Sequence, residues 1–172
     1  AELIKSAYSS VLRISKLTQT LLLLTKIAND QFPEKRSVNL SDLLEEKIKL
    51  FEDQINGKSL TLKKEIEPDC FLETNFFLAE SMIVNLVGNA VKHCITGGII
   101  NIRLNKSKLE ISNSGNSFSF PSSKLFERFF KVNTSSESQG LGLSIVKEIC
   151  SLNEWKIGYL YEDKLHKFII EF

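Results

Sequence analysis

The most informative stretch of the chain runs from Met82 to Cys94 and reads Met-Ile-Val-Asn-Leu-Val-Gly-Asn-Ala-Val-Lys-His-Cys. Within it, Asn85 and Asn89 lie one helical turn apart and Lys92 follows at a spacing of three, so the three side chains share a helix face. The remaining positions are apolar enough to bury: Ile83, Val84, Leu86, Val87, Ala90 and Val91. The pattern predicts a helix that packs on a core and presents two amides and an ammonium along one edge.

A second motif lies roughly fifty residues downstream, where Gly140-Leu141-Gly142-Leu143 opens another apolar helix. Glycines at a helix entrance let backbone N–H groups approach an anion, and the helix dipole favours negative charge there. Amide oxygens can ligate Mg²⁺, and a lysine meets phosphate as a point charge. Each motif alone has an ordinary explanation, as an amide pair bonded to backbone or a flexible helix start. Together they predict a nucleotide site.

Composition sets the outer limits on function. The 172 residues are 42% apolar, enough for one ordinary core, and the net charge is +1 without a basic run, which argues against a nucleic-acid partner. No apolar stretch is long enough for a membrane segment, so we expect a soluble chain. The three cysteines fit no zinc pattern and predict buried free thiols in a reducing compartment: Cys70, Cys94 and Cys150.

Residues 2–30 contain neither proline nor glycine and predict one long helix. Apolar residues recur along it with heptad spacing, interrupted by Ser10: Leu3, Ala7, Ile14, Leu17, Leu21, Leu24 and Ala28. One helix cannot bury such a stripe, so we expect a homodimer through this helix and a partner helix upstream. Pro33 ends the pattern, which divides the chain into residues 1–32 and 33–172.

Patterning after Pro33 predicts alternating strands and helices. We expect a strand at 38–40, a helix capped by Ser41 that ends near Gly57, strands at 60–66 and 70–72, and a long helix capped by Asn75. A hairpin at 99–104 and 108–112, a helix at 141–152, and strands at 156–161 and 165–172 follow. The serine-containing stretch between Gly115 and Gly140 is long enough to predict either a functional lid or a disordered loop.

These motifs, in this order, resemble the catalytic ATP-binding domain of a bacterial sensor histidine kinase, preceded by the second helix of its dimerisation and phosphoacceptor domain. The four boxes of that family are similar to Asn85–His93 (asparagine box), Ile111–Ser117 (first glycine box), Leu125–Lys131 (phenylalanine box) and Gln139–Leu143 (second glycine box). The resemblance covers essentially the whole chain. It implies an α+β fold: a two-layer α/β sandwich with a mixed, mainly antiparallel sheet on about three helices, after a long N-terminal coiled-coil helix.

The resemblance also implies the roles of individual residues. Asn89 would ligate Mg²⁺, Arg128 would be catalytic by meeting the γ-phosphate, and Phe126 and Phe129 would anchor the lid. The full set implied for ATP binding is Asn85, Asn89, Lys92, His93, Asn113, Gly115, Phe126, Phe129, Lys131, Gly140, Leu141, Gly142 and Leu143.

Two departures from the family pattern bear on this assignment. The first glycine box has Asn113 where the family has the aspartate that accepts from the adenine amino group, and Ser117 where it has a second glycine. An asparagine oxygen can still accept that hydrogen bond. No histidine carries the acidic residue and proline of the phosphoacceptor motif: His93 belongs to the asparagine box, and His166 is expected in the core or at the edge of the last strand. This chain alone should therefore not autophosphorylate.

Three functional hypotheses remain open. The preferred one is a kinase that binds Mg·ATP and donates the γ-phosphoryl to a histidine absent from this chain, for relay to the receiver domain of a response regulator; it would be cytoplasmic, with the parent protein anchored in the inner membrane. The second is a non-transferring module with a degenerate ATP site that acts as a dimerisation or regulatory scaffold. The third is a clamp ATPase of the gyrase and chaperone type, in which a carboxylate base would stand where this helix has Asn85 or Asn89.

Overall fold

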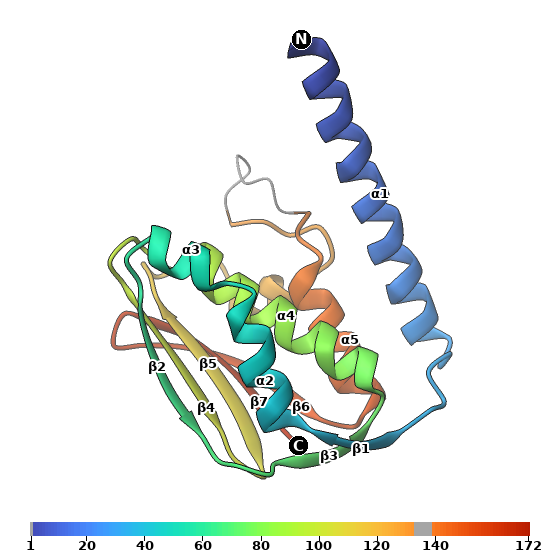
Figure 1. Ribbon diagram of the computed structural model, residues 1–172, viewed down its shortest axis with the longest axis vertical. Coiled ribbons are helices and arrows are strands. Elements are labelled where there is room, and N and C mark those ends of the chain that lie inside the picture. The colour runs from blue at the N-terminus through green and yellow to red at the C-terminus, as the bar shows by residue number, and fades with distance from the viewer. Residues whose placement is uncertain (1, 133–138) are drawn as a thin grey trace.

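A computed structural model describes residues 2–132 and 139–172 (Figure 1). Residues 133–138, which belong to the predicted lid, lie outside the described residues, as does the side chain of Leu3. In chain order the elements are α1 (Glu2–Ala28), β1 (Arg36–Asn39), α2 (Leu40–Lys49), α3 (Glu52–Gly57), β2 (Thr61–Ile66), β3 (Phe71–Thr74), α4 (Phe76–His93), β4 (Ile99–Leu104), β5 (Lys108–Ser114), the 3₁₀ helix η1 (Ser122–Phe126), α5 (Gly142–Leu152), β6 (Lys156–Glu162) and β7 (Leu165–Glu171).

The strands form a five-stranded sheet in the order β2-β4-β5-β7-β6 and a separate antiparallel pair, β1-β3. Only β2 and β4 run parallel among the strand pairs of the described sheet, so the sheet is mixed and mainly antiparallel. The helices α2, α4 and α5 lie together over one face of this sheet (Figure 1). The predicted α+β fold, with a long N-terminal helix, is confirmed.

The helix α4 is central to the helical layer and begins as predicted. The side-chain oxygen of Asn75 accepts hydrogen bonds from the backbone N–H groups of Phe77 and Leu78 at 3.0 and 3.3 Å. Its apolar face is buried among α2, α5 and β5 and consists of Leu78, Ala79, Met82, Ile83, Leu86, Val87, Ala90 and Val91. Each large side chain buried in this way stabilises the fold by about 1.5–3 kcal/mol. The edge left uncovered is the one that carries Asn85 and Asn89.

The start of α2 differs from the sequence prediction. Asn39, and not Ser41, is the N-cap, since its side-chain oxygen accepts from the backbone N–H groups of Ser41 and Asp42. The hydroxyl of Ser41 instead donates to the carbonyl of Glu67 at 2.7 Å and accepts from the N–H of Cys70 at 3.1 Å. Ser41, which the local pattern predicted as the N-cap, therefore makes a tertiary contact instead.

The single helix predicted to end near Gly57 is broken into α2 and α3. The break falls at Leu50 and Phe51, where Phe51 leaves the helical region with φ −110° and ψ 3°. Its ring packs under α4, so close that a Cβ on Gly88 would lie 3.3 Å from it. The three cysteines are buried and free, as predicted.

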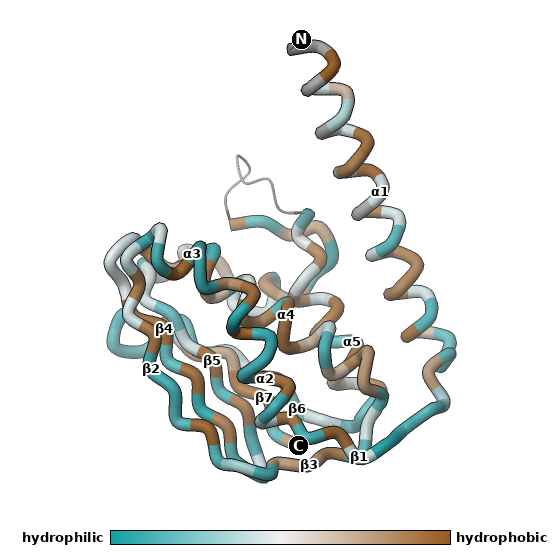
Figure 2. Tube along the Cα trace, in the orientation of Figure 1, coloured by the Kyte–Doolittle hydropathy of each residue, from teal (hydrophilic) through white to brown (hydrophobic). Residues whose placement is uncertain are grey.

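The helix α1 leaves the body of the molecule and projects beyond it (Figure 1). Near its C-terminal end, Leu24 and Ile27 are buried, and α1 contacts α5. Farther toward the N-terminus, apolar residues recur along the projecting helix (Figure 2) and are exposed at Ile4, Tyr8, Val11, Leu12, Ile14, Leu21 and Leu22. No helix in the described ranges is both long and apolar enough to cross a membrane.

Candidate functional site

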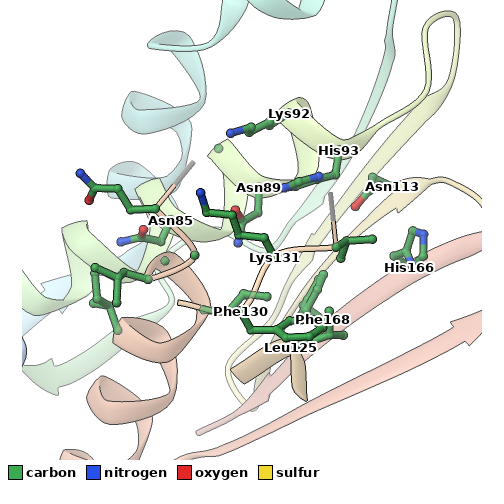
Figure 3. Close-up of a pocket in the computed structure, with 18 of the residues that line it drawn as sticks. Asn85, Asn89, Lys92, His93, Asn113, Leu125, Phe130, Lys131, His166 and Phe168 are labelled. Atoms are coloured by element: carbon green, nitrogen blue, oxygen red, sulfur yellow. The ribbon is translucent and has the colours of Figure 1, made fainter. Parts of the chain in front are cut away.

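A pocket of about 1040 Å³ lies between the uncovered edge of α4, the segment around η1 and the turn that opens α5 (Figure 3). Its size is that of a site for a small-molecule ligand or cofactor. The structure brings into its lining most of the residues predicted for ATP binding: Asn85, Asn89, Lys92, His93, Asn113, Gly115, Lys131, Gly140, Leu141, Gly142 and Leu143. Residues from three distant parts of the sequence therefore meet in one cavity.

The two asparagines on α4 are in different states. The amide nitrogen of Asn85 donates to the carbonyl of Ser81 at 2.8 Å, which leaves its oxygen directed at the start of α5. Asn89 makes no side-chain hydrogen bond to any described residue and lies half-buried in the pocket wall (Figure 3). The explanation that such amides only bond to backbone thus holds for the amide nitrogen of Asn85. The side-chain nitrogen and oxygen of Asn89 are both left for a ligand.

The charges around the pocket favour a polyanion. Lys92 from α4 and Lys131 from the segment after η1 both contribute to its lining. No aspartate or glutamate belongs to the lining among the residues that the structure describes. Two ammonium groups at one cavity raise the local concentration of a multiply charged anion such as a polyphosphate.

The same lining fits Mg²⁺ only in company with phosphate. The described residues contain no group of three His, Cys, Asp or Glu side chains that could hold a metal ion by themselves. The pocket offers the neutral amide oxygens of Asn85 and Asn89, and Mg²⁺ is commonly held by one or two protein ligands plus phosphates and water. The donor set is therefore compatible with a metal that arrives already bound to a nucleotide.

The turn that opens α5 explains both of its glycines. Gly140 has φ +69°, and a Cβ there would lie 2.5 Å from the carbonyl oxygen of Phe130. A Cβ on Gly142 would lie 2.8 Å from the side-chain oxygen of Asn85, so the absence of a side chain lets α5 start against the asparagine edge. The N-cap of α5, Leu141, makes no side-chain capping bond, which leaves N–H groups of the first turn for an anion.

The other end of the pocket holds Asn113 and His166 (Figure 3); the sequence predicts a core or edge position on the last strand for His166, as observed, but does not predict its place in the pocket. The amide nitrogen of Asn113, which is only 2% exposed, donates to the carbonyl of Ser114 at 3.2 Å, so its oxygen is the group left for a ligand. His166 is the cross-strand partner of Asn113 on β7 and lies 5% exposed in the same wall. Had the sequence shown that the last strand pairs with the strand that carries Asn113, it would have placed His166 beside the site.

His166 is fixed by its neighbours around the first glycine box. Its Nδ1 lies 2.7 Å from the Tyr159 hydroxyl, and its ring stacks on Phe118 with centroids 4.4 Å apart. A Cβ on Gly115 would lie 2.5 Å from the ring, so the glycine is needed for this approach. Burial lowers the pKa of His166, and a hydrogen bond with the backbone of Asn116 partly offsets the shift.

His93 is the second histidine of the pocket and stays exposed at its wall. Desolvation by the surrounding protein lowers the pKa of His93, and the charges of Lys92 and Lys58 act in the same direction. Because much of the ring meets solvent, we expect this shift to be weaker than burial of the whole side chain would give.

Three predicted residues are not brought into the pocket lining. Arg128 forms an ion pair with Glu148 on α5, with Nη2 and Oε1 3.1 Å apart. Phe126 packs edge-on against Phe168 at a centroid distance of 6.4 Å, consistent with an anchor, but Phe129 is 55% exposed with φ +64°. The next residue, Phe130, lines the pocket instead of Phe129. The left-handed backbone at Phe129 turns the Phe129 side chain outward.

A sequence model of the family described as histidine kinase-, DNA gyrase B- and HSP90-like ATPase matches residues 77–167. The chain is similar to the heme sensor protein HssS of Staphylococcus aureus strain Newman, with 35% identity over 164 residues that cover 91% of this chain and 35% of that protein. It thus spans about a third of the length of this relative.

The solved structures that are similar to the chain include two histidine kinases. The histidine kinase AdeS of Acinetobacter baumannii matches with a TM-score of 0.79 and 22% identity, over 98% of this chain and 82% of that one, a likeness of fold alone. The catalytic domain of the histidine kinase ThkA matches with a TM-score of 0.68 and 29% identity, over 80% of this chain and 94% of that one.

Proposed function

The chain belongs to the family of histidine kinase-, DNA gyrase B- and HSP90-like ATPases, as the catalytic ATP-binding domain of a sensor histidine kinase, and on that premise we propose that it binds Mg·ATP and donates the γ-phosphoryl group. The observation that carries this proposal is the pocket lining: two lysines, the asparagine pair of α4, Asn113 and an uncapped helix start, without a carboxylate among the described residues.

The proposed roles follow from what each group has left to offer. Asn113 accepts from the adenine amino group through its free oxygen, while Lys92, Lys131 and the first-turn N–H groups of α5 bind the phosphates. Asn89 ligates Mg²⁺, which when bound would neutralise charge on the phosphates. Catalysis here is mainly positioning and charge stabilisation, because phosphoryl transfer requires little covalent chemistry from the protein.

Arg128 stays a proposed catalytic residue under one condition. Its guanidinium is now paired with Glu148, so it could meet the γ-phosphate only after that ion pair opens. The pair is solvent-accessible, and exposed pairs of this kind contribute only about 0.2–1 kcal/mol, which binding of a polyphosphate can outweigh.

The wider setting is proposed as well. We infer that residues 1–32 are the second helix of a dimerisation and phosphoacceptor domain, that residues 33–172 are the catalytic domain, and that α1 mediates a homodimer. The phosphoryl acceptor is a histidine outside this chain, and a response regulator receiver domain takes the group next. The setting is cytoplasmic, with a parent protein held in the inner membrane.

Two measurements test this function. Calorimetric titration with ATP, with and without Mg²⁺, should show saturable binding that strengthens with the metal. The parent protein with its upstream helix, incubated with ATP labelled on the γ-phosphate, should become labelled on histidine, whereas this chain alone should not. Absence of metal-dependent saturation would contradict the proposal, and ATP hydrolysis without any histidine acceptor would favour a clamp ATPase.

A degenerate scaffold is the second candidate, and Asn113 together with Ser117 is the observation that favours it. If the first glycine box has lost adenine recognition, then Asn113→Asp should restore tight binding to a protein that otherwise binds ATP poorly. If the natural chain already prefers adenine over guanine nucleotides, the kinase proposal stands and Asn113→Asp should only adjust that preference.

A further inference from the structure

Lys58, which lies in the turn between α3 and β2, reaches the C-terminal end of α4, the helix that carries Asn85 and Asn89. Its ammonium nitrogen donates to three backbone carbonyls at the C-terminus of α4: those of Val91 at 3.0 Å, Lys92 at 2.7 Å and Cys94 at 3.1 Å. The last carbonyls of a helix have no partners within the helix, and the negative end of the helix dipole lies there. A single side chain from a distant element thus satisfies this helix end.

The backbone of Lys58 is itself held in place. Its N–H donates to the carbonyl of Gln54 at 3.1 Å, and its carbonyl accepts from the N–H of Gly97 at 2.9 Å. No carboxylate of the described residues forms an ion pair with Lys58. Its charge is therefore directed at the carbonyls of α4.

The helix end that Lys58 caps is part of the candidate pocket. Lys92 and His93, the last two residues of α4, line the pocket, and Ile95 just beyond the helix does so as well. The final backbone bond of this region, from the N–H of Cys94 to the carbonyl of Ala90 at 2.9 Å, holds the turn that carries both side chains. A frayed last turn would let Lys92 and His93 leave the cavity.

We propose that Lys58 is a positioning residue for nucleotide binding, which acts by fixing the C-terminal turn of α4 and thereby aiming Lys92 and His93 into the pocket. This inference rests on the proposed function, since the ligand is the Mg·ATP of the same site. Lys58 itself does not belong to the pocket lining.

The test compares Lys58→Met, which keeps most of the aliphatic stem and removes the donors, with Lys63→Met on the exposed side of β2 as the matched control. Mg·ATP affinity of Lys58→Met should fall about fivefold or more, and Lys63→Met should match the natural protein. Hydrogen exchange of the Cys94 amide, measured without nucleotide, should accelerate in Lys58→Met alone. If Lys58→Met does not fold, Lys58→Gln, which keeps two donors, takes its place.

A double-mutant cycle with Lys92→Met separates positioning from general stabilisation. If Lys58 acts through Lys92, its replacement should cost much less affinity once Lys92 is already methionine. Fully additive losses, or an affinity and Cys94 exchange rate unchanged by Lys58→Met, would overturn the proposal while the natural chain still binds Mg·ATP. A natural chain that binds no Mg·ATP would overturn the proposed function itself, and this inference with it.

Discussion

Asn85 and Asn89 are the same residue type one turn apart, yet the fold uses them differently. Asn85 donates its amide N–H to a carbonyl of its own helix and keeps only its oxygen, which faces Gly142, for the pocket, whereas Asn89 keeps both groups. Asn113 shows the same division at the other end, where its amide nitrogen donates to the carbonyl of Ser114 and its oxygen is left for a ligand. Residue type alone therefore does not show which candidate residues can bind a ligand. The hydrogen bonds that each side chain already makes within the protein show this.

Replacing Asn89 by alanine should remove the metal ligand without harming the fold. We expect Mg²⁺-dependent ATP affinity to fall at least about tenfold, equivalent to about 1.4 kcal/mol, because one of few protein ligands is lost. Titration calorimetry measures this, and the melting temperature should stay unchanged because Asn89 has no partner among the described residues. Asn56→Ala, on the exposed surface of α3, is the control; equal affinity in both variants would rule out the metal role.

The buried imidazole of His166 should make stability depend on pH. Its pKa in the folded state lies below the ordinary value of 6.5, so the unfolded chain binds a proton more readily than the native one. Stability is therefore complete above pH 6.5 and falls as the pH drops from there to the folded-state pKa. Denaturant unfolding at about pH 8 and about pH 5 should show the loss, and His166→Gln should reduce it. An equally steep loss in His166→Gln would assign the effect to other groups.

Among the elements, the entrance of α5 and the segment after η1 depend on each other. Gly140 adopts φ +69° directly against the backbone of Phe129 and Phe130, and this contact sets Phe130 and Lys131 at the pocket. The same entrance brings Gly142 against Asn85 on α4. The close contacts at Gly140 and Gly142, where no side chain fits, thus fix the relative positions of α4, α5 and the segment after η1.

Gly140→Ala should disturb this registration. A Cβ at φ +69° and 2.5 Å from a carbonyl oxygen forces the backbone to move, which should cost about 1–2 kcal/mol of stability and weaken Mg·ATP binding. Thermal unfolding and calorimetric titration measure both effects. Gly158→Ala on β6 is the matched control, because no atom lies within 4 Å of its added Cβ. Similar effects of the two substitutions would contradict the role of the close approach.

In the molecule as a whole, α1 is joined to the rest of the chain where it contacts α5. In the C-terminal half of α1, Leu24 and Ile27 are buried against the body and Leu17 and Leu23 are partly buried, while the projecting part keeps an apolar stripe in solvent (Figure 2). Such a stripe is an unfavourable surface for an isolated helix and a favourable one for a helical bundle. This is the physical basis of the proposed homodimer.

Polar substitution on this stripe should dissociate the dimer. Ile14 and Leu21 are 63% and 37% exposed, so Ile14→Glu with Leu21→Glu should yield a monomer while the catalytic body keeps its melting temperature. Sedimentation velocity measures the change, and Leu50→Glu, an exposed leucine at the end of α2, is the control. If the natural chain already sediments as a monomer, the proposed pairing through α1 is wrong.

Much of the fold could be predicted because the deciding patterns are local. The long helices, the hairpin of β4 and β5, the last two strands and the cap at Asn75 follow from periodicity and turn chemistry that need no distant contact. The prediction failed at Ser41 and at Phe51, where a hydroxyl and a ring bind elements far along the chain. Local propensity cannot anticipate such partners.

The candidate site divides in the same way. The asparagine face of α4 and the glycine turn before α5 could be derived from the sequence, because a helix face and a glycine turn impose fixed spacings, and the other site residues followed from the resemblance to sensor histidine kinases. Tertiary structure alone decided which groups stay free: it paired Arg128 with Glu148, turned Phe129 outward, brought His166 beside Asn113 and set Lys58 under the end of α4. The physical reason is that the sequence determines which chemical groups a side chain carries. Which of these groups remain unpaired depends on neighbours that only folding brings close.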